Sequence, residues 1–552
     1  MRTHFTTVIV AIVLFVFAGP PASIVPRAIA EPKHQHSHVV ANPWQLVDEP
    51  SLGAKQNDRI ITPRAYSVFG VDAGLLAATL RTAPLEFTAA AREGAPHVMT
   101  LPMPDGSVQR FAIQESPVME EALAARYPQI DTYIAQGIDD RAATVRLDLT
   151  PLGFHAQILS PNGAVYIDPI YRGDTTHYIS YYKRDYVKAG DDFVCLVDEV
   201  RDTASKTGAP TAPAATIGQT LRTYRLALAC TGEYSVAVCN INGVSQTVDN
   251  TFAAMTTSVN RVVGVYESEL AIRMVLVAND TSLVYLNGAT DPYTNSSGST
   301  MLSQNQSTCD SVIGSGNYDI GHVFSTGGGG IAGLGVVCRN GNKANGVTGL
   351  SQPVGDGFDI DYVAHEMGHQ FGANHTFNSN TGSCGGGNRS ASHAYEVGSG
   401  STIMAYAGIC GAGDLQPHSD PYFHGTSFDE IVQYTNVGAG NNCPVQTSTG
   451  NNEPTGSAGA AYSIPINTPF ELTALNGSDP NSDALTYCWE EFDLGPAGNS
   501  TTDNGSSPIL RSFNPSSSPT RVFPKISSLI SNTSPYGEVL PTTTRTMTYP
   551  CT

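Results

Sequence analysis

The chain has 552 residues, which is too long for one hydrophobic core and indicates two to four domains. It is 41% hydrophobic and 14% charged, and its 54 glycines and 35 prolines follow no collagen-like period, so the composition excludes a disordered chain and a collagen. With 29 Lys and Arg against 49 Asp and Glu, the formal net charge is −20; such a surface repels phosphate backbones and argues against a nucleic-acid partner.

The first thirty residues have the pattern of a secretory signal peptide. Arg2 is positive, Val8–Ala18 is a short apolar run, and Ala28-Ile29-Ala30 is an A-x-A cleavage signal. The apolar run is well short of the roughly 20 residues that a membrane span needs. We therefore predict a secreted protein with a signal peptide at 1–30 and no transmembrane anchor after its removal.

Residues 31–218 are expected to form an N-terminal region that ends in a linker. Its strand-like segments are Ala143–Leu149 and Gly153–Leu159, and a helix is predicted around Met119–Arg126. No catalytic pattern is visible in this region. Thr203–Gly218 is rich in Thr, Ala, Pro and Gly, which predicts a domain boundary that proteases can reach.

Residues 219–446 alternate between strand and helix patterns. Strands are predicted at Leu221–Ala229, Ile272–Val277 and Tyr318–Ser325. Steps of three and four separate the apolar residues of one helical stripe, which are Phe252, Met255, Val259, Val262, Val263 and Tyr266. Strands that alternate with helices indicate a layered α/β domain.

Beyond a polar linker at 447–459, the hydrophobic pattern changes to a period of two. Apolar residues alternate with polar ones in two runs, Phe470–Ala474 and Leu485–Trp489, with a turn-rich segment between them. This pattern predicts a β-sandwich-like domain of the immunoglobulin or cadherin kind at 460–552. We expect that this domain is truncated at Thr552.

One segment carries the pattern H-E-x-x-H-x-x-G-x-x-H. His365 and His369 are four residues apart, so both imidazoles point to one side of a helix, where Glu366 can reach the rim of the same site. Gly372 tolerates the positive φ that ends a helix, and the turn brings in His375 as a third ligand. Three histidines with a fourth position left for water predict one catalytic zinc ion rather than a closed structural site.

The residues that flank this motif have predicted structural roles. Asp359 and Asp361 are candidate N-caps that also supply negative charge at the start of the helix. Val363 and Phe371 are expected to face the core while the histidines face the cleft.

The motif and two further stretches resemble a known family. The three stretches are Tyr318–Cys338, Phe358–Asn378 and Gly398–Gly411, the last with a methionine-containing turn. On these residues the chain resembles the metzincin metalloendopeptidases and is most similar to the bacterial secreted reprolysin-like group, which is related to the adamalysins. The resemblance implies a multidomain α+β protein in which a twisted mixed sheet and an active-site helix form the catalytic domain, between an N-terminal propeptide and the C-terminal sandwich.

By position, His365, His369 and His375 match the zinc ligands of that family and Glu366 matches its general base. A carboxylate there can take a proton from a water that zinc acidifies and pass it to the leaving amine. The resemblance also implies that Gly327–Gly335 leads into the edge strand that lines the substrate cleft.

Met404 matches the methionine that packs under the histidines in metzincins. Tyr406 lies two residues further on. Some metzincin branches carry a tyrosine there that ligates zinc reversibly and stabilises the oxyanion, whereas adamalysin-like members usually lack it. A catalytic role and a packed turn residue therefore both stay open for Tyr406.

The cysteines suggest one switch and several bridges. Cys195 ends the N-terminal region, and as a thiolate it could block the zinc of a zymogen; a disulfide or an inert thiol is the alternative, because its neighbours do not match the best-known switch motifs. The resemblance implies the bridges Cys338–Cys443 and Cys384–Cys410, and more loosely Cys230–Cys239, which leaves Cys309 without an obvious partner.

A weaker metal pattern lies near the C-terminus. Asp479, Asn481 and Asp483 form D-x-N-x-D, and Glu490 stands at the twelfth place of a calcium loop. The sixth place is Ala484 instead of glycine, so a turn with solvated acids is the alternative to a Ca²⁺ site.

Together these features predict a secreted zinc endopeptidase that is made as a zymogen and hydrolyses internal peptide bonds of proteins. Two alternatives stay open at this point. One is a non-catalytic adhesion or binding protein on a metzincin scaffold, and the other is a zinc hydrolase of another substrate class, such as an amidase. The oligomeric state stays open as well.

Overall fold

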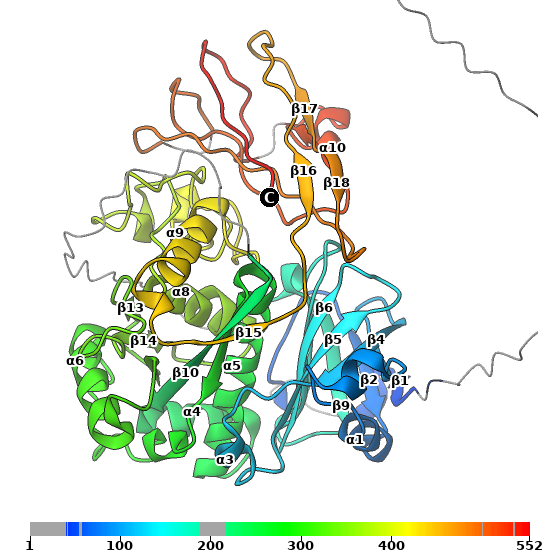
Figure 1. The fold of residues 1–552 in the computed structure, drawn as a ribbon, viewed down its shortest axis with the longest axis vertical. Coiled ribbons are helices and arrows are strands. Elements are labelled where there is room, and N and C mark those ends of the chain that lie inside the picture. The colour runs from blue at the N-terminus through cyan, green and yellow to red at the C-terminus, as the bar shows by residue number, and fades with distance from the viewer. Residues whose placement is uncertain (1–39, 41, 54–57, 188–216, 499–500, 534–535) are drawn as a thin grey trace, which may run out of the picture. The chain divides into compact units, whose positions relative to one another are not determined.

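The computed structural model describes residues 40, 42–53, 58–187, 217–498, 501–533 and 536–552 (Figure 1). The predicted signal peptide, Cys195 and the linker up to residue 216 lie outside the described residues. Among the described helices, none is both long and apolar enough to cross a membrane.

The N-terminal region is built on one antiparallel sheet of nine strands in the order β1-β2-β9-β8-β7-β6-β5-β4-β3 (Figure 1). The strands predicted at Ala143–Leu149 and Gly153–Leu159 are confirmed as β6 and β7, which form a hairpin because Gly153 (φ 115°) allows the tight turn between them. The strands are β1 (Trp44–Leu46), β2 (Ser67–Val71), β3 (Val98–Pro102), β4 (Val108–Glu115), β5 (Asp131–Gly137), β6 (Thr144–Thr150), β7 (Gly153–Leu159), β8 (Val165–Pro169) and β9 (His177–Tyr182).

The helices of this region are short. They are α1 (Ala73–Arg81), α2 (Ala89–Glu93) and α3 (Glu121–Ala124). The helix expected around Met119–Arg126 is confirmed as α3 but is shorter, because Met119 is extended and forms a parallel bridge with Leu276. The backbone groups of residues 118 and 120 form hydrogen bonds with Leu276 in place of those of a first helical turn.

The second sheet has the order β11-β10-β12-β14-β13, with β15 beside the first part of β10. Strands β10, β11, β12 and β14 are parallel, while β13 is an antiparallel edge. Its strands are β10 (Thr220–Cys230), β11 (Ile272–Leu276), β12 (Ile320–Ser325), β13 (Gly330–Ala332), β14 (Gly346–Gly349) and β15 (Val445–Ser448), which confirms all three strands predicted from the sequence here. Its helices are α4 (Gly232–Asn242), α5 (Val248–Leu270), α6 (Gly298–Cys309), α7 (Asp356–Phe358), α8 (His365–Gln370) and α9 (Gly425–Asn436).

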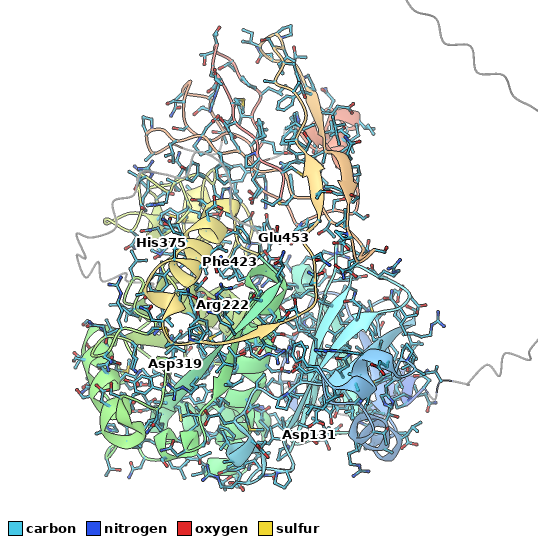
Figure 2. All side chains as sticks on the ribbon, in the orientation of Figure 1. Asp131, Arg222, Asp319, His375, Phe423 and Glu453 are labelled. Carbon is cyan, nitrogen blue, oxygen red and sulfur yellow. A yellow bond between two sulfur atoms is a disulfide. The ribbon has the colours of Figure 1, made fainter. Side chains whose placement is uncertain are left out.

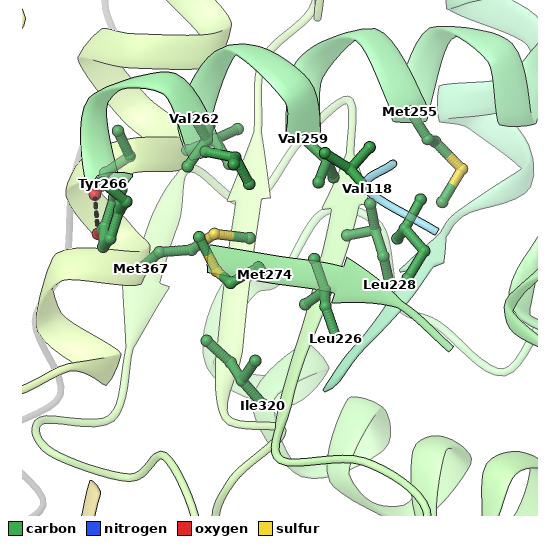
Figure 3. Close-up of a cluster of buried hydrophobic side chains, with 14 of the residues drawn as sticks. Val118, Leu226, Leu228, Met255, Val259, Val262, Tyr266, Met274, Ile320 and Met367 are labelled. Atoms are coloured by element: carbon green, nitrogen blue, oxygen red, sulfur yellow. Dashed lines mark hydrogen bonds between the residues drawn. The ribbon is translucent and has the colours of Figure 1, made fainter. Parts of the chain in front are cut away.

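Helix α5 packs along this sheet and confirms the predicted apolar stripe. Val259 and Val262 point from α5 towards Leu226 and Met274 on the strands (Figure 3). Thr247 caps the start of the helix, since its side chain accepts a hydrogen bond from a backbone N–H of the first turn. At the other end, the Tyr266 hydroxyl donates to the carbonyl of Ala364 (2.8 Å), the residue directly before His365.

The C-terminal part has few strands. β16 (Thr455–Ser457) pairs with β18 (Leu475–Ser478), and β17 (Phe470–Thr473) pairs with β19 (Thr520–Phe523), followed by α10 (Ile526–Ile530). The expected β-sandwich is not confirmed: the second alternating run makes only isolated bridges, at Tyr487 and Trp489. A two-stranded pair buries too little surface to form a core face, and the small core here consists of Trp489, Ile509, Leu510 and Phe523.

Candidate metal centre

The helix that carries the first two histidines begins earlier than the sequence indicates. Helix α7, a π-helical segment at Asp359–Ala364 and α8 form one continuous helical run. Asp359 and Asp361 therefore lie inside this run, and their expected role as N-caps is wrong. Asp359 instead accepts hydrogen bonds from Ser258 and Arg261. Its carboxylate is therefore bound by residues of α5 and does not cap the helix.

A glycine turn brings the third histidine to the helix. After α8 the chain turns at Gly372, whose φ of 101° few other residues adopt, as the sequence predicts. Val363 and Phe371 are fully buried in the core, which confirms the prediction that they face the core. His375 lies near α8 and α9 (Figure 2), and the neighbouring Asn374 is hydrogen-bonded to Glu430 on α9.

The three imidazoles converge through their Nε2 atoms. The Nε2–Nε2 distances are 3.1 Å for His365 and His369, 3.0 Å for His369 and His375, and 3.3 Å for His365 and His375. All three side chains are buried. Among the described residues, they form the only group of three or more His, Cys, Asp or Glu side chains placed to share a metal ion.

The Nδ1 atoms fix which ring nitrogen carries the proton. Each Nδ1 lies 2.7 Å from a backbone carbonyl oxygen, which can only accept a hydrogen bond. The proton of each neutral ring is therefore on Nδ1, and each Nε2 presents a lone pair to the other two. The three carbonyl acceptors belong to Ile403, Ala373 and Asn388.

This donor set fits a zinc ion. Three lone pairs within 3.3 Å of one another repel unless a cation lies between them, and tetrahedral Zn–N bonds of about 2.0–2.1 Å place nitrogens about 3.3–3.4 Å apart. Burial lowers the pKa of His365 to about 4 and the pKa values of His369 and His375 well below their usual range. The rings are therefore neutral near pH 7, as metal ligands must be.

The methionine turn lies directly against the helix. Met404 is fully buried, and its carbonyl accepts a hydrogen bond from Thr376 N–H (3.2 Å), just after the third histidine. The preceding carbonyl, of Ile403, holds His365. Tyr406 is also buried, with its ring centroid 4.6 Å from that of His375. The turn therefore packs against the imidazoles and fixes one of them by a hydrogen bond.

Glu366 is fully buried on α8 between the two helical histidines. The edge strand β13 lies within the segment Gly327–Gly335, which was expected to lead into it, and α8 contacts β13. The N–H of Gly335 donates to the carbonyl of His369 (2.9 Å), so the loop after the edge strand is hydrogen-bonded to the helix of the metal ligands.

Two acidic residues that support the site were missed by the sequence analysis. Glu396 accepts hydrogen bonds from Thr376 (2.6 Å) and from the N–H of Ser401 (2.7 Å), and so joins the loop of the third histidine to the methionine turn. Glu430 accepts two hydrogen bonds from Asn374. Glu396 is 20 residues from Thr376 and Glu430 is 56 residues from Asn374, so no local spacing could have indicated that they support the loop of the third histidine.

The disulfides agree only in part with expectation. Cys338–Cys443 and Cys384–Cys410 are present, as the resemblance implies. The looser pair Cys230–Cys239 is wrong: both thiols are free and buried, and each faces a hydroxyl, of Ser235 and Thr251 respectively. Cys309 is also a free, buried thiol.

The calcium prediction is not supported. Asp479 accepts hydrogen bonds from the N–H groups of Asn481 and Asp483, which makes a self-contained turn. Glu490 is buried elsewhere and accepts from the N–H of Gly425 (2.7 Å) at the start of α9. The carboxylate at the twelfth place thus caps a helix instead of joining the loop.

Two histidines on one helix, a third beyond a glycine turn and a methionine packed beneath them define a metzincin-type metallopeptidase domain. Residues 220–434 match the family described as Metallo-peptidase family M12B Reprolysin-like, and this segment is therefore a reprolysin-like metallopeptidase domain. The protein is accordingly a zinc metalloendopeptidase, a hydrolase that acts on peptide bonds.

Among solved structures, the chain is similar to the crystal structure of metalloproteinase-II from Bacteroides fragilis. The two share 11% sequence identity with a TM-score of 0.35, over 65% of this chain and 94% of that chain. No curated protein matches the chain.

Proposed function

We propose that the protein is a secreted zinc endopeptidase, made as a zymogen, in which Glu366 is the general base. The observation that carries this proposal is the convergence of three Nε2 lone pairs within 3.3 Å, each fixed by a backbone carbonyl on Nδ1. Such a preorganised set of neutral donors is the arrangement of a catalytic zinc site with a position left for water.

When bound, zinc supplies a Lewis acid that polarises the scissile carbonyl and acidifies a water molecule. Glu366 accepts the proton of the attacking water on a carboxylate oxygen and returns it to the nitrogen of the leaving amine. Burial of Glu366 and the histidines keeps bulk water from competing for that proton. We assign Tyr406, whose ring packs against His375, the role of donating a hydrogen bond from its hydroxyl to the developing oxyanion.

The substrate is an extended stretch of polypeptide. Strand β13 is an edge strand next to α8, so a substrate backbone that adds to this edge would lie beside the metal ligands. Pairing with an edge strand does not require a free terminus of the substrate, which favours cleavage of internal peptide bonds.

Export and latency are supported by the sequence. The pattern at 1–30 is that of a signal peptide, and two disulfides suit an oxidising compartment. Cys195 is our candidate for the thiolate that blocks the metal before activation, on its position at the end of the propeptide region. Cys195→Ala is expected to raise the activity of the uncut chain.

The test is Glu366→Gln in the full chain, with zinc content measured by mass spectrometry and turnover measured on casein. We expect one zinc per chain and a loss of turnover of about 10²- to 10⁴-fold. The matched control is Glu471→Gln, which alters an exposed glutamate on β17 and should leave both values unchanged. Retained proteolysis by Glu366→Gln contradicts the general-base role. Wild-type protein that binds zinc but cleaves no protein favours the adhesion or amidase alternative.

A further inference from the structure

Part of the N-terminal region extends the sheet of the peptidase domain. The N–H of Leu276 in β11 donates to the carbonyl of Val118 (2.8 Å), and the N–H of Glu120 donates to the carbonyl of Leu276 (2.9 Å). The Glu120 carboxylate then accepts from the N–H of Ala278 (2.7 Å). Residues 118–120 therefore cover the edge of β11, which would otherwise present unpaired backbone groups.

The same region supplies side chains to the core of the peptidase domain. Val118 lies against Leu228 and Met255, on β10 and α5 (Figure 3). Five buried residues of the N-terminal region belong to this cluster, and each is at most 6% exposed: Val118, Met119, Leu123, Ile130 and Leu152. One hydrophobic cluster thus spans the two regions, and separation would expose apolar surface on both.

Buried ion pairs cross the same interface. Arg261 on α5 pairs with Asp168 on β8 as well as with Asp359. The other pairs that cross are Arg146 with Glu267 and Arg273 with Glu86, and each of these side chains is at most 10% exposed. Removal of one partner from a buried pair leaves a charge without compensation, which is strongly unfavourable.

Lys183, just after β9, contacts the helical run that carries two of the metal ligands. Its Nζ lies 2.6 Å from a carboxylate oxygen of Asp356 and 3.1 Å from one of Asp361. Both aspartates lie on the helical run that continues into His365. Lys183 therefore holds together two carboxylates on the helix of the metal ligands, and without it they would repel each other in a buried place.

We propose that residues 40–187 stay bound to residues 217–552 after the chain is cut between them, so that the mature peptidase consists of two chains. The inference rests on the proposed function for the cut itself, and it differs from a propeptide that leaves on activation. The binding partner of the peptidase domain is thus the enzyme's own N-terminal region, held by a backbone bridge to β11, a shared hydrophobic cluster and buried ion pairs.

The test introduces a recognition sequence for a site-specific protease after Pro210 in the full chain. After complete cleavage, size-exclusion chromatography is run at about 0.15 M and about 1 M NaCl, where exposed charges are largely screened. We expect both fragments to elute together, at the volume of the uncut chain, at both salt concentrations. Elution of the N-terminal fragment apart from the peptidase fragment overturns the proposal, whether or not either fragment remains folded.

Two variants of the cut protein test the interface itself. Lys183→Met removes a buried cation at the interface, while the control Arg110→Met removes an exposed cation that pairs with Asp139 within the N-terminal region. After dilution, we expect the fragments of Lys183→Met to separate at least about tenfold faster than those of the control. Equal rates contradict the role given to Lys183.

Casein hydrolysis measured on the same fractions separates the two proposals. The cut after Pro210 leaves Cys195 on the retained fragment, so activity is measured with Cys195→Ala in the same chain. A two-chain Cys195→Ala complex without activity contradicts the proposed function alone, whereas separated fragments with an active peptidase fragment contradict this inference alone.

Discussion

The sulfur of Met404 lies directly against Gly368: a Cβ atom at position 368 would stand 2.4 Å from Sδ and 3.3 Å from Cε. Gly368 is the last residue before His369 in the metal-binding helix. The methionine turn can reach the helix only because this position has no side chain, and the same turn holds His365 through the carbonyl of Ile403. The contact therefore couples the packing of the turn to the geometry of the ligands.

Gly368→Ala is the first test of this coupling. The added methyl group must displace Met404, and overpacking of this kind destabilises by about 1–3 kcal/mol. We expect a lower melting temperature and weaker zinc binding, both partly restored when Met404→Ala is added. A double-mutant cycle on the melting temperature measures the coupling. Strictly additive effects of the two substitutions would show that they do not act through this contact.

Metal removal should destabilise the wild-type protein. Because the Nδ1 protons are held by carbonyls, the Nε2 lone pairs face one another at 3.0–3.3 Å once the cation is gone. A ligand at a hundred times its Kd stabilises the folded state by about 2.7 kcal/mol, so a chelator should lower the melting temperature and zinc should restore it. In His369→Gln we expect neither shift, and a chelator effect of equal size there would contradict the assignment.

The spacing of the metal motif defines one face of a helix, and that is why the ligands and Gly372 were predictable. Their supporting partners were not. Asn388, Glu396 and Glu430 are brought to the site by loops and by α9, and no local period relates them to the histidines. A long-range contact also made the predicted N-cap role of Asp359 wrong, since Arg261 donates a hydrogen bond to its carboxylate.

The fold shows a similar division. The apolar stripe of α5 and the strands β6, β7, β10, β11 and β12 follow from periodicity, because each has one face or both faces in a core. Alternation at Phe470–Ala474 predicted a strand, but it could not supply the further strands that a sandwich needs. The extended conformation of Met119 depends on the edge of β11, which lies far away in sequence.

Glu269 should make the stability depend on pH. Burial raises the pKa of Glu269 to about 7, and the nearby Glu490 charge adds to the rise. A hydrogen bond from the N–H of Phe423 acts in the opposite direction and lowers the pKa, but it does not cancel the rise. Between about pH 4.5 and pH 7 the folded chain holds a proton that the unfolded chain has released. Stability from this group is therefore fully present below about pH 4.5 and is lost as pH rises to about 7.

The measurement compares the melting temperatures of the wild type and Glu269→Gln at about pH 5 and about pH 8. The variant keeps the shape of the side chain but has no titrating group. We expect the variant to gain stability relative to the wild type as pH rises between these values. A difference that does not change with pH would show that Glu269 does not titrate in this window.

Tyr406→Phe separates packing from catalysis. The ring centroid of Tyr406 lies 4.4 Å from that of Phe377 and 4.6 Å from that of His375, and phenylalanine preserves these contacts. If the hydroxyl stabilises the oxyanion, kcat should fall by about 10²- to 10³-fold with zinc content and melting temperature unchanged. An unchanged kcat would leave Tyr406 as a packed turn residue, which is the alternative that the sequence also allows.

The two disulfides should differ in what their loss affects. Cys338–Cys443 closes a loop of 105 residues and Cys384–Cys410 one of 26, for which chain entropy gives about 4.8 and about 3.5 kcal/mol of stability. Cys384 of the shorter loop lies close in sequence to Asn388, whose carbonyl accepts the Nδ1 proton of His375, whereas both cysteines of the longer loop lie far from it. We therefore expect the double Cys→Ser variant of the longer loop to lose more in melting temperature, and that of the shorter loop to lose more in zinc affinity, measured by competition with a chelator. If both variants lose zinc affinity equally, the backbone around Asn388 keeps its place without the bridge, and the orientation of His375 depends on Asn374 and Glu430 instead.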